Sequence, residues 1–212
     1  MHTKPASDRV KRIVKKVLNR GVFYNDKIAE TTCFDCSAGR TNSAMDVWGF
    51  EAPYLVSVAS PFDRRAKAYL QVHTYSRSEL VRAFEQGFGI NLEEKGVPPQ
   101  KWFRVLNRTD GGYNKEMVIA GHRKIYAGFL NKVVPITGKL VRQLVLPDIG
   151  SAKFKVKYIK NKDSFEFTSY GWGHGVGLSQ EGARYLAQEK GYNYVQIIKY
   201  YFPGTKVKKI YS

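Results

Sequence analysis

The chain has 212 residues, with 35 Lys and Arg against 18 Asp and Glu, which gives a net charge of +17 and an isoelectric point near 9.8. Hydrophobic residues make up 43% of the chain and aromatic residues 14%. This is enough for a packed core and argues against a disordered chain. The charge favours anionic partners, such as nucleic acid or an anionic bacterial envelope.

Membrane and export signals are missing from the sequence. No run approaches the roughly 18 apolar residues that cross a bilayer. The N-terminus also lacks the apolar core of a signal peptide. We therefore expect no membrane span and no export signal in the sequence as written.

In the first half of the chain, the apolar spacing predicts helices interspersed with strands. Ser76 and Glu79 form a capping-box pattern, which predicts that a helix starts at this point. The predicted elements are an amphipathic helix at 7–18, strands at 22–24 and 27–34 around the turn Asn25-Asp26, strands at 53–60 and 69–74, an ordered loop with little regular structure at 36–49, and a helix from 77 to about 88.

The second half is predicted to be richer in hairpins. Turn residues separate the strand patterns, and Pro98-Pro99 marks a possible sub-domain connector near 91–100. The predicted elements are hairpins at 103–120 and 154–168, a short helix at about 122–133, helices at 180–191 and 194–201, and an edge strand at 207–211. Hairpins without regular βα alternation predict an α+β fold, with largely antiparallel strands and interspersed short helices, in a single domain over 1–212.

The most informative run is GWGHGVGLSQEGA at 171–183, with four glycines in seven positions. Such density is useful where the backbone takes positive φ or passes close to another group. Ser179 is placed to cap a helix and Glu181 falls in its first turn. The run matches neither common nucleotide-binding glycine motif. We therefore expect a tight loop that leads into a helix.

This run, together with YYFPGT at 200–205, resembles the closing signature of the stage II sporulation protein D family, which includes the amidase-enhancer proteins. Shorter stretches agree with the same pattern, namely GRT at 39–41, DVWG at 46–49, PYL at 53–55, and 144–148. The resemblance covers nearly the whole chain, from about Val10 to Tyr211.

The resemblance implies a domain that binds and remodels peptidoglycan in the cell envelope, outside the cytoplasmic membrane. The implied partners are glycan strands and other cell-wall hydrolases. The family contains lytic transglycosylases, in which one carboxylic acid serves both steps of glycan cleavage. The family's catalytic glutamate lies upstream of the part that this chain matches. We therefore match no catalytic residue and expect an N-terminally truncated, catalytically incomplete domain.

Six residues are candidates for substrate binding: His174, Trp172, Ser179, Gln180, Arg40 and Tyr54. His174 either approaches ligand hydroxyls or ties the loop to neighbouring backbone. Trp172 either stacks on a sugar ring or packs in the core. Arg40 suits a carboxylate of peptidoglycan or the carbonyls of its own loop. Glu181 is a poor general acid, because a helix N-terminus lowers the pKa of a carboxyl group.

Cys33 and Cys36 form a Cys-x-x-Cys pair. A zinc site there would need two more ligands, so a pair of partly buried thiols is the simpler interpretation and no cofactor is required. The rival function is a basic nucleic-acid-binding module. It accounts for the charge but not for the glycine run, and the cations are spread along the chain rather than gathered in a reader motif, so nucleic acid is disfavoured.

Overall fold

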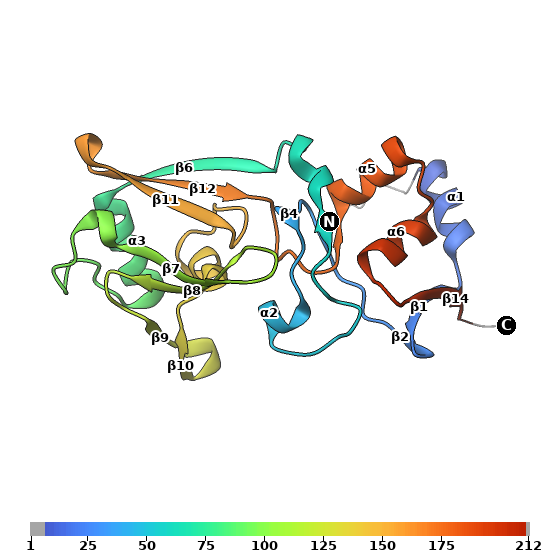
Figure 1. Ribbon diagram of the computed structural model, residues 1–212, viewed down its shortest axis with the longest axis horizontal. Coiled ribbons are helices and arrows are strands. Elements are labelled where there is room, and N and C mark those ends of the chain that lie inside the picture. Colours follow the sequence, from blue (N-terminus) through green and yellow to red (C-terminus); the bar gives the residue numbers. More distant parts are fainter. Residues whose placement is uncertain (1–6, 211–212) are drawn as a thin grey trace.

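Short helices and small sheets alternate along the chain in the computed structural model, which describes residues 7–210 (Figure 1). This arrangement confirms the predicted α+β class. The helices are α1 (Asp8–Val17), α2 (Ala44–Trp48), α3 (Arg77–Phe88), α4 (Gly138–Leu140), α5 (Gln180–Lys190) and α6 (Tyr194–Tyr201). A π-helix, η4 (Val141–Val145), continues α4, and short 3-10 helices are η1 (Pro61–Arg65), η2 (Pro99–Lys101), η3 (Gly128–Leu130) and η5 (Lys160–Lys162).

The strands pair mostly as antiparallel neighbours. They are β1 (Arg20–Tyr24), β2 (Lys27–Ile28), β3 (Cys33–Phe34), β4 (Gly39–Arg40), β5 (Ala59–Ser60), β6 (Leu70–Ser76), β7 (Phe103–Arg108), β8 (Asn114–Ile119), β9 (Lys124–Ala127), β10 (Lys132–Pro135), β11 (Phe154–Ile159), β12 (Ser164–Tyr170), β13 (Leu178–Ser179) and β14 (Lys206–Lys209). Two sheets have three strands, in the orders β11-β12-β6 and β14-β1-β2. Strand β13 pairs with β3 in parallel.

Two clusters of buried side chains form the core. The larger cluster lies where α3 and the β7-β8 pair meet the β11-β12-β6 sheet, at the left of Figure 1. In it, the Trp102 ring stacks on Phe165 with centroids 5.3 Å apart. The smaller cluster joins α5 and α6 through Leu186, Ile197 and Tyr201, at the right of the same view. The run that follows β12 connects the two.

Several predicted elements are confirmed, with the expected turn and cap chemistry. Ser76 and Glu79 form the capping box of α3, with the Ser76 backbone N–H donating to Glu79 Oε2 at 2.7 Å. Asn25 and Asp26 both take positive φ in the turn between β1 and β2. Both long hairpins, β7-β8 and β11-β12, are present.

Three predictions in the first half were wrong in part. The strand predicted at 27–34 is split into β2 and β3, and most of the strand predicted at 53–60 is irregular, with only β5 formed. The loop predicted at 36–49 contains β4 and the five-residue α2. Helix α2 starts because Ser43 Oγ accepts from the Asp46 backbone N–H at 3.1 Å, and it ends at Gly49 in the left-handed region.

The helix predicted after Gly121 was also wrong, because residues 124–135 form the β9-β10 hairpin. Ile125 and Ala127 are buried while Tyr126 between them is exposed. This alternation has the strand period of two, which overrides the helical spacing of Ile125, Phe129 and Val133. The α4-η4 segment had not been predicted at all.

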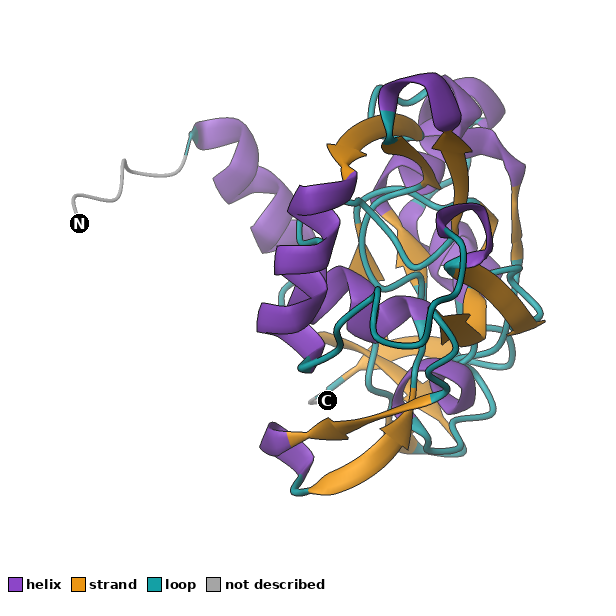
Figure 2. Ribbon diagram, turned by 90° about the vertical axis from the view of Figure 1, so that its left-hand side faces the viewer, coloured by secondary structure: helices purple, strands orange, loops and turns teal. Residues whose placement is uncertain are grey.

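The described ends of the chain are α1 and β14. Helix α1 forms as predicted, with Ser7 as its cap, but it buries none of its residues and stands away from the body in Figure 2. Strand β14 pairs with β1 as the predicted edge strand, and Tyr211 lies outside the described residues. Leu92, in the predicted connector, is buried in the larger cluster. Between residues 7 and 210, no helix is long and apolar enough to cross a membrane.

Candidate functional site

The glycine run takes the backbone conformation that its composition predicts. Gly171, Gly173, Gly175 and Gly177 all have positive φ, between 78° and 107°. A Cβ on Gly177 would lie 2.3 Å from the carbonyl oxygen of Thr32. Glycine is therefore required at this position both for its conformation and for the close approach of a neighbouring backbone.

Backbone hydrogen bonds fix this loop against the segment 36–42. The N–H of Trp172 donates to the carbonyl of Cys36 at 2.8 Å, and the Cys36 N–H donates back at 3.1 Å. Further along, the Asn42 N–H donates to the carbonyl of Gly175 at 2.6 Å. The loop is thus held in place along its length, and the side chains between the glycines have defined directions.

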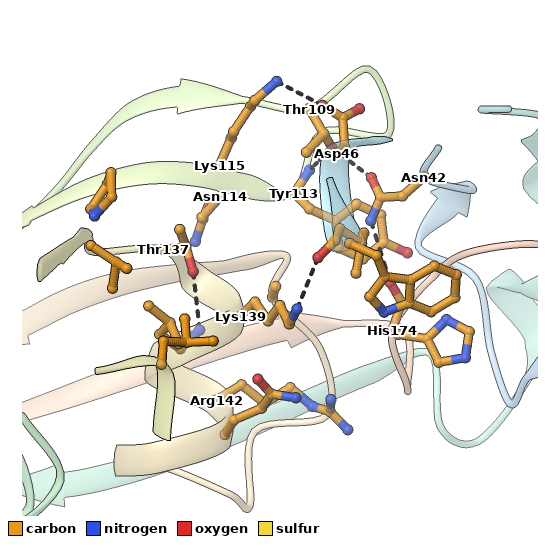
Figure 3. Close-up of a pocket in the computed structure, with 18 of the residues that line it drawn as sticks. Asn42, Asp46, Thr109, Tyr113, Asn114, Lys115, Thr137, Lys139, Arg142 and His174 are labelled. Carbon is orange, nitrogen blue, oxygen red and sulfur yellow. Dashed lines mark hydrogen bonds and ion pairs between the residues drawn. The ribbon is translucent and has the colours of Figure 1, made fainter. Parts of the chain in front are cut away.

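A cleft of about 790 Å³ opens beside the loop at His174. Its walls come from α2, β8, the β9-β10 hairpin and the helical segment 137–143, as Figure 3 shows. Trp48 and Phe129 supply aromatic surface, and Asn42 and Thr137 supply polar groups. The volume is within the range of small-molecule sites, which combine apolar walls with a few polar groups.

The charged side chains of the cleft are mostly positive. Lys115, Lys132, Lys139 and Arg142 line it, and Asp46 is the single carboxylate among the described residues that do so. Lys115 Nζ lies 2.7 Å from Asp46 Oδ1. This contact raises the pKa of Lys115, first through the hydrogen bond and then through the charge of Asp46. Asp46 is therefore engaged as an ion-pair partner.

His174 presents a ring whose two nitrogens are both occupied. The Val176 N–H donates to Nδ1 at 3.1 Å, so Nε2 carries the proton and donates to the carbonyl of Cys33, also at 3.1 Å. Burial lowers the pKa of His174, nearby Arg142 and Lys139 lower it further, and the hydrogen bond to Cys33 opposes them. The neutral imidazole positions the loop through these two hydrogen bonds. It also presents a ring surface to the cleft, with its centroid 5.1 Å from that of the Trp48 ring.

Three other sequence candidates lie outside the lining of the cleft. Trp172 is 37% exposed. The Arg40 guanidinium donates to Ser57, from Nε to the hydroxyl at 3.0 Å and from Nη2 to the carbonyl at 3.2 Å. The Tyr54 hydroxyl accepts from the Glu30 N–H at 3.0 Å. The structure therefore does not gather Trp172, Arg40 and Tyr54 around His174, and their part in substrate binding stays a prediction.

Ser179 is buried beneath the loop, in a network centred on Asp63. Its hydroxyl caps α5, accepting from the Gly182 N–H at 3.3 Å, and donates to the Asp63 carboxylate. Asp63, which is 1% exposed, also accepts from the Ser37 N–H at 2.8 Å and the Ser60 hydroxyl at 2.7 Å. Burial raises the pKa of Asp63, and the hydrogen bonds from Ser179 and Ser60 oppose this. Sequence reasoning missed Asp63, because nothing in the local pattern marks a buried carboxylate.

The remaining candidates lie at the start of α5 and in β3. Gln180 is exposed, with Nε2 3.9 Å from the Sγ of exposed Cys33. Glu181 pairs with Arg184 on the same helix. Cys36 is buried, which raises the pKa of its thiol to about 12. Across residues 7–210 no three His, Cys, Asp or Glu side chains come together as a metal site, and zinc at the two cysteines stays a prediction for metal analysis.

Comparison with known proteins identifies relatives of this chain, although no family model matches it. It is 30% identical over 206 residues to stage II sporulation protein D of Bacillus subtilis (strain 168), an alignment that covers 97% of this chain and 52% of that protein. It is 32% identical over 186 residues to the protein of the same name from Bacillus amyloliquefaciens, covering 88% and 47%. The chain belongs to the stage II sporulation protein D family.

The chain spans about half the length of these stage II sporulation protein D relatives. A shorter stretch of 60 residues, 27% of this chain, is 42% identical to the amidase enhancer of Bacillus subtilis (strain 168), of which it covers 8%. The names of these relatives refer to sporulation and to enhancement of an amidase. The resemblance stated from the sequence is thereby confirmed at the level of the family.

Sequence reasoning missed the cleft residues Trp48, Lys139 and Arg142 in this member of the stage II sporulation protein D family. Trp48 was noted only as part of the family pattern. The sequence holds a local signal for the other two, because Thr137 is of a residue type that caps helices. In the structure its side chain accepts from the Leu140 N–H at 3.1 Å and starts α4. From that cap, Lys139 and Arg142 are three residues apart on the helical segment and share one of its faces.

Proposed function

We propose that this chain binds the glycan strands of peptidoglycan in the cleft beside His174, as part of a role in the bacterial cell wall. Membership of the stage II sporulation protein D family supports the cell-wall setting. The same resemblance supports a location outside the cytoplasmic membrane and association with other wall hydrolases. The observation that carries the proposal is the aromatic and polar cleft beside the glycine loop.

The chemistry of the cleft suits a sugar polymer. Trp48 is 36% exposed and lines the cleft, with its ring also stacked on Phe50 at 5.9 Å. An aromatic face in this position packs against the C–H face of a sugar ring, while nearby amide and hydroxyl groups, such as those of Asn42 and Thr137, hydrogen-bond to sugar hydroxyls. The glycan is proposed to lie along the cleft, which residues of α2 and of the helical segment 137–143 line (Figure 3).

Binding, rather than cleavage, is the proposed activity of these residues. A lytic transglycosylase needs a carboxylic acid that is protonated when it meets the glycosidic oxygen. Asp46 is the one carboxylate among the described residues of the cleft lining, and Lys115 holds it in an ion pair. We therefore expect no release of anhydro-muropeptides when the purified chain is incubated with sacculi. Clear release would contradict this part of the proposal.

The test of the binding site is a sedimentation assay with purified sacculi. Trp48→Ala should weaken binding by about tenfold or more, because a central aromatic contact typically contributes over ~1.4 kcal/mol. Tyr194→Ala is the matched control, since Tyr194 is 41% exposed but lies on α6, away from the cleft lining. Equal affinity for the wild type and Trp48→Ala would place binding elsewhere.

Salt dependence separates this proposal from general attraction by the net charge of +17. Binding to nucleic acid through phosphate contacts weakens steeply as salt rises, because counterions are released on binding. Binding of sacculi through sugar contacts in the cleft should remain saturable at high salt. If affinity for sacculi falls as steeply as affinity for DNA, charge alone explains the binding.

A further inference from the structure

The cleft is lined by more cationic side chains than carboxylates that could neutralise them. Lys115 is neutralised by Asp46. No carboxylate in the described part of the chain lies within ion-pair distance of Lys132, Lys139 or Arg142. Partly buried cations such as Lys139 and Arg142 lose hydration without gaining a counter-charge from the protein, and an anionic ligand would offset that free-energy cost.

Lys139 is a fixed cation rather than a mobile surface lysine. Its Nζ donates to the carbonyl oxygen of Val47 at 2.8 Å, which ties α4 to α2 across the cleft. An ammonium group has three N–H donors, and this contact uses one of them. Burial lowers the pKa of Lys139. The two remaining donors are held at the cleft and are available to a ligand.

The Arg142 side chain has a buried hydrogen-bond donor that is unsatisfied. Its Nε is buried and has no hydrogen-bond partner, and burial lowers the pKa of the guanidinium. A guanidinium stays charged and presents a planar set of donors that matches a carboxylate with two parallel hydrogen bonds. In Figure 3 its side chain reaches toward His174 from the same helical segment as Lys139. A carboxylate is the ligand group that best satisfies these donors.

Lys139 and Arg142 act at the same place. They lie three residues apart on the α4-η4 segment, so they project from one face of it. Both line the same cleft as His174, and the charge of each lowers the pKa of the imidazole. His174, whose Nδ1 accepts a hydrogen bond from the Val176 N–H, adds no charge of its own there, so Lys139 and Arg142 supply the positive charge.

We infer that Lys139 and Arg142 form a carboxylate-binding subsite, so that the cleft prefers glycans carrying acidic groups over neutral glycans. This inference rests on the proposed function, since it assumes that a glycan occupies the cleft. In peptidoglycan, the carboxylate comes either from the lactyl group of the muramic acid sugar or from an attached peptide. Both sources present the same chemistry to the two cations.

The test compares three oligosaccharides of equal length by isothermal titration calorimetry. They are a muramic-acid tetrasaccharide with free lactyl carboxylates, the same glycan bearing its peptides, and the neutral tetramer of N-acetylglucosamine. The wild type should bind at least one acidic form about tenfold or more tightly than the neutral tetramer. The tighter of the two acidic forms identifies the source of the carboxylate.

Variants then locate the preference. Arg142→Gln and Lys139→Gln should each reduce the ratio of acidic to neutral affinity several-fold, and the double variant should bring it near one. Lys155→Gln removes the same charge from an exposed position on β11 and should leave the ratio unchanged. The ratio of acidic to neutral affinity is measured on the wild type alone, so the proposal remains testable even if a variant fails to fold.

The outcomes separate the two levels of the proposal. Equal affinity of the wild type for acidic and neutral glycans would overturn the carboxylate subsite and leave glycan binding standing. A preference that survives in the double variant would also overturn it. If none of the three glycans binds, the proposed function fails, and the subsite fails with it.

Discussion

At the scale of single residues, His174 shows how a side chain of catalytic type becomes a positioning group. Its Nδ1 accepts from Val176 and its Nε2 donates to Cys33, so neither nitrogen is free for proton transfer. The sequence left two interpretations open, a ligand contact and a tie to the backbone. The hydrogen bonds establish the tie, while the position of the ring in the cleft lining keeps ligand contact as a prediction.

The protonation of His174 is directly testable. Burial and the charges of Arg142 and Lys139 lower its pKa, so its NMR titration midpoint should lie below about 6.5. The unfolded chain then binds a proton at higher pH than the folded chain. His174 therefore stabilises the fold above about pH 6.5, and this contribution is lost as the pH falls. A midpoint above that of a model histidine would contradict the assignment.

At the scale of elements, the glycine loop tolerates a side chain less well than the glycine that ends α5. Gly177 and Gly191 both have positive φ, at 80° and 66°. A Cβ on Gly191 would meet nothing within 4 Å, whereas one on Gly177 would meet the Thr32 carbonyl at 2.3 Å. Alanine at Gly191 therefore tests the free-energy cost of positive φ alone, whereas alanine at Gly177 adds the cost of a steric clash.

Alanine substitutions at these two glycines should have unequal effects. Gly191→Ala should lower the free energy of unfolding by about 1 kcal/mol, the usual cost of a left-handed residue. Gly177→Ala should cost about 3 kcal/mol or more, because a packed backbone must also move. Denaturant unfolding measures both. Similar values for the two variants would mean that the loop is not held against 32–34 as described.

The elements that the sequence predicted well are those with strong local signals. The α3 capping box, the Asn25-Asp26 turn and the glycine run are all encoded by adjacent residues. The β9-β10 hairpin was mistaken for a helix because Ile125, Phe129 and Val133 satisfy helical spacing by coincidence. Only burial of Ile125 and Ala127 against the larger cluster reveals the strand period.

At the scale of the whole molecule, the cleft lies where the two hydrophobic clusters meet. Leu140 on one wall belongs to the larger cluster, and Val47 on the other packs against the smaller one. Residues nearly one hundred positions apart, such as Val47 and Lys139, are brought into contact only by the tertiary fold. For this reason the sequence predicted the loop that borders the site but not the lysines and arginine that line it.

The three tryptophans of the chain allow ligand binding in the cleft to be measured in one experiment. Trp48 lines the cleft, Trp172 is exposed outside its lining, and Trp102 is fully buried, with its indole N–H donating to the Val97 carbonyl at 2.8 Å. Each gives one indole N–H signal in an NMR spectrum of the ¹⁵N-labelled protein. Titration with a soluble peptidoglycan oligosaccharide should shift the Trp48 signal saturably and leave that of buried Trp102 in place. A shift of the Trp172 signal with Trp48 unchanged, or no shift of any indole signal, would contradict binding in this cleft.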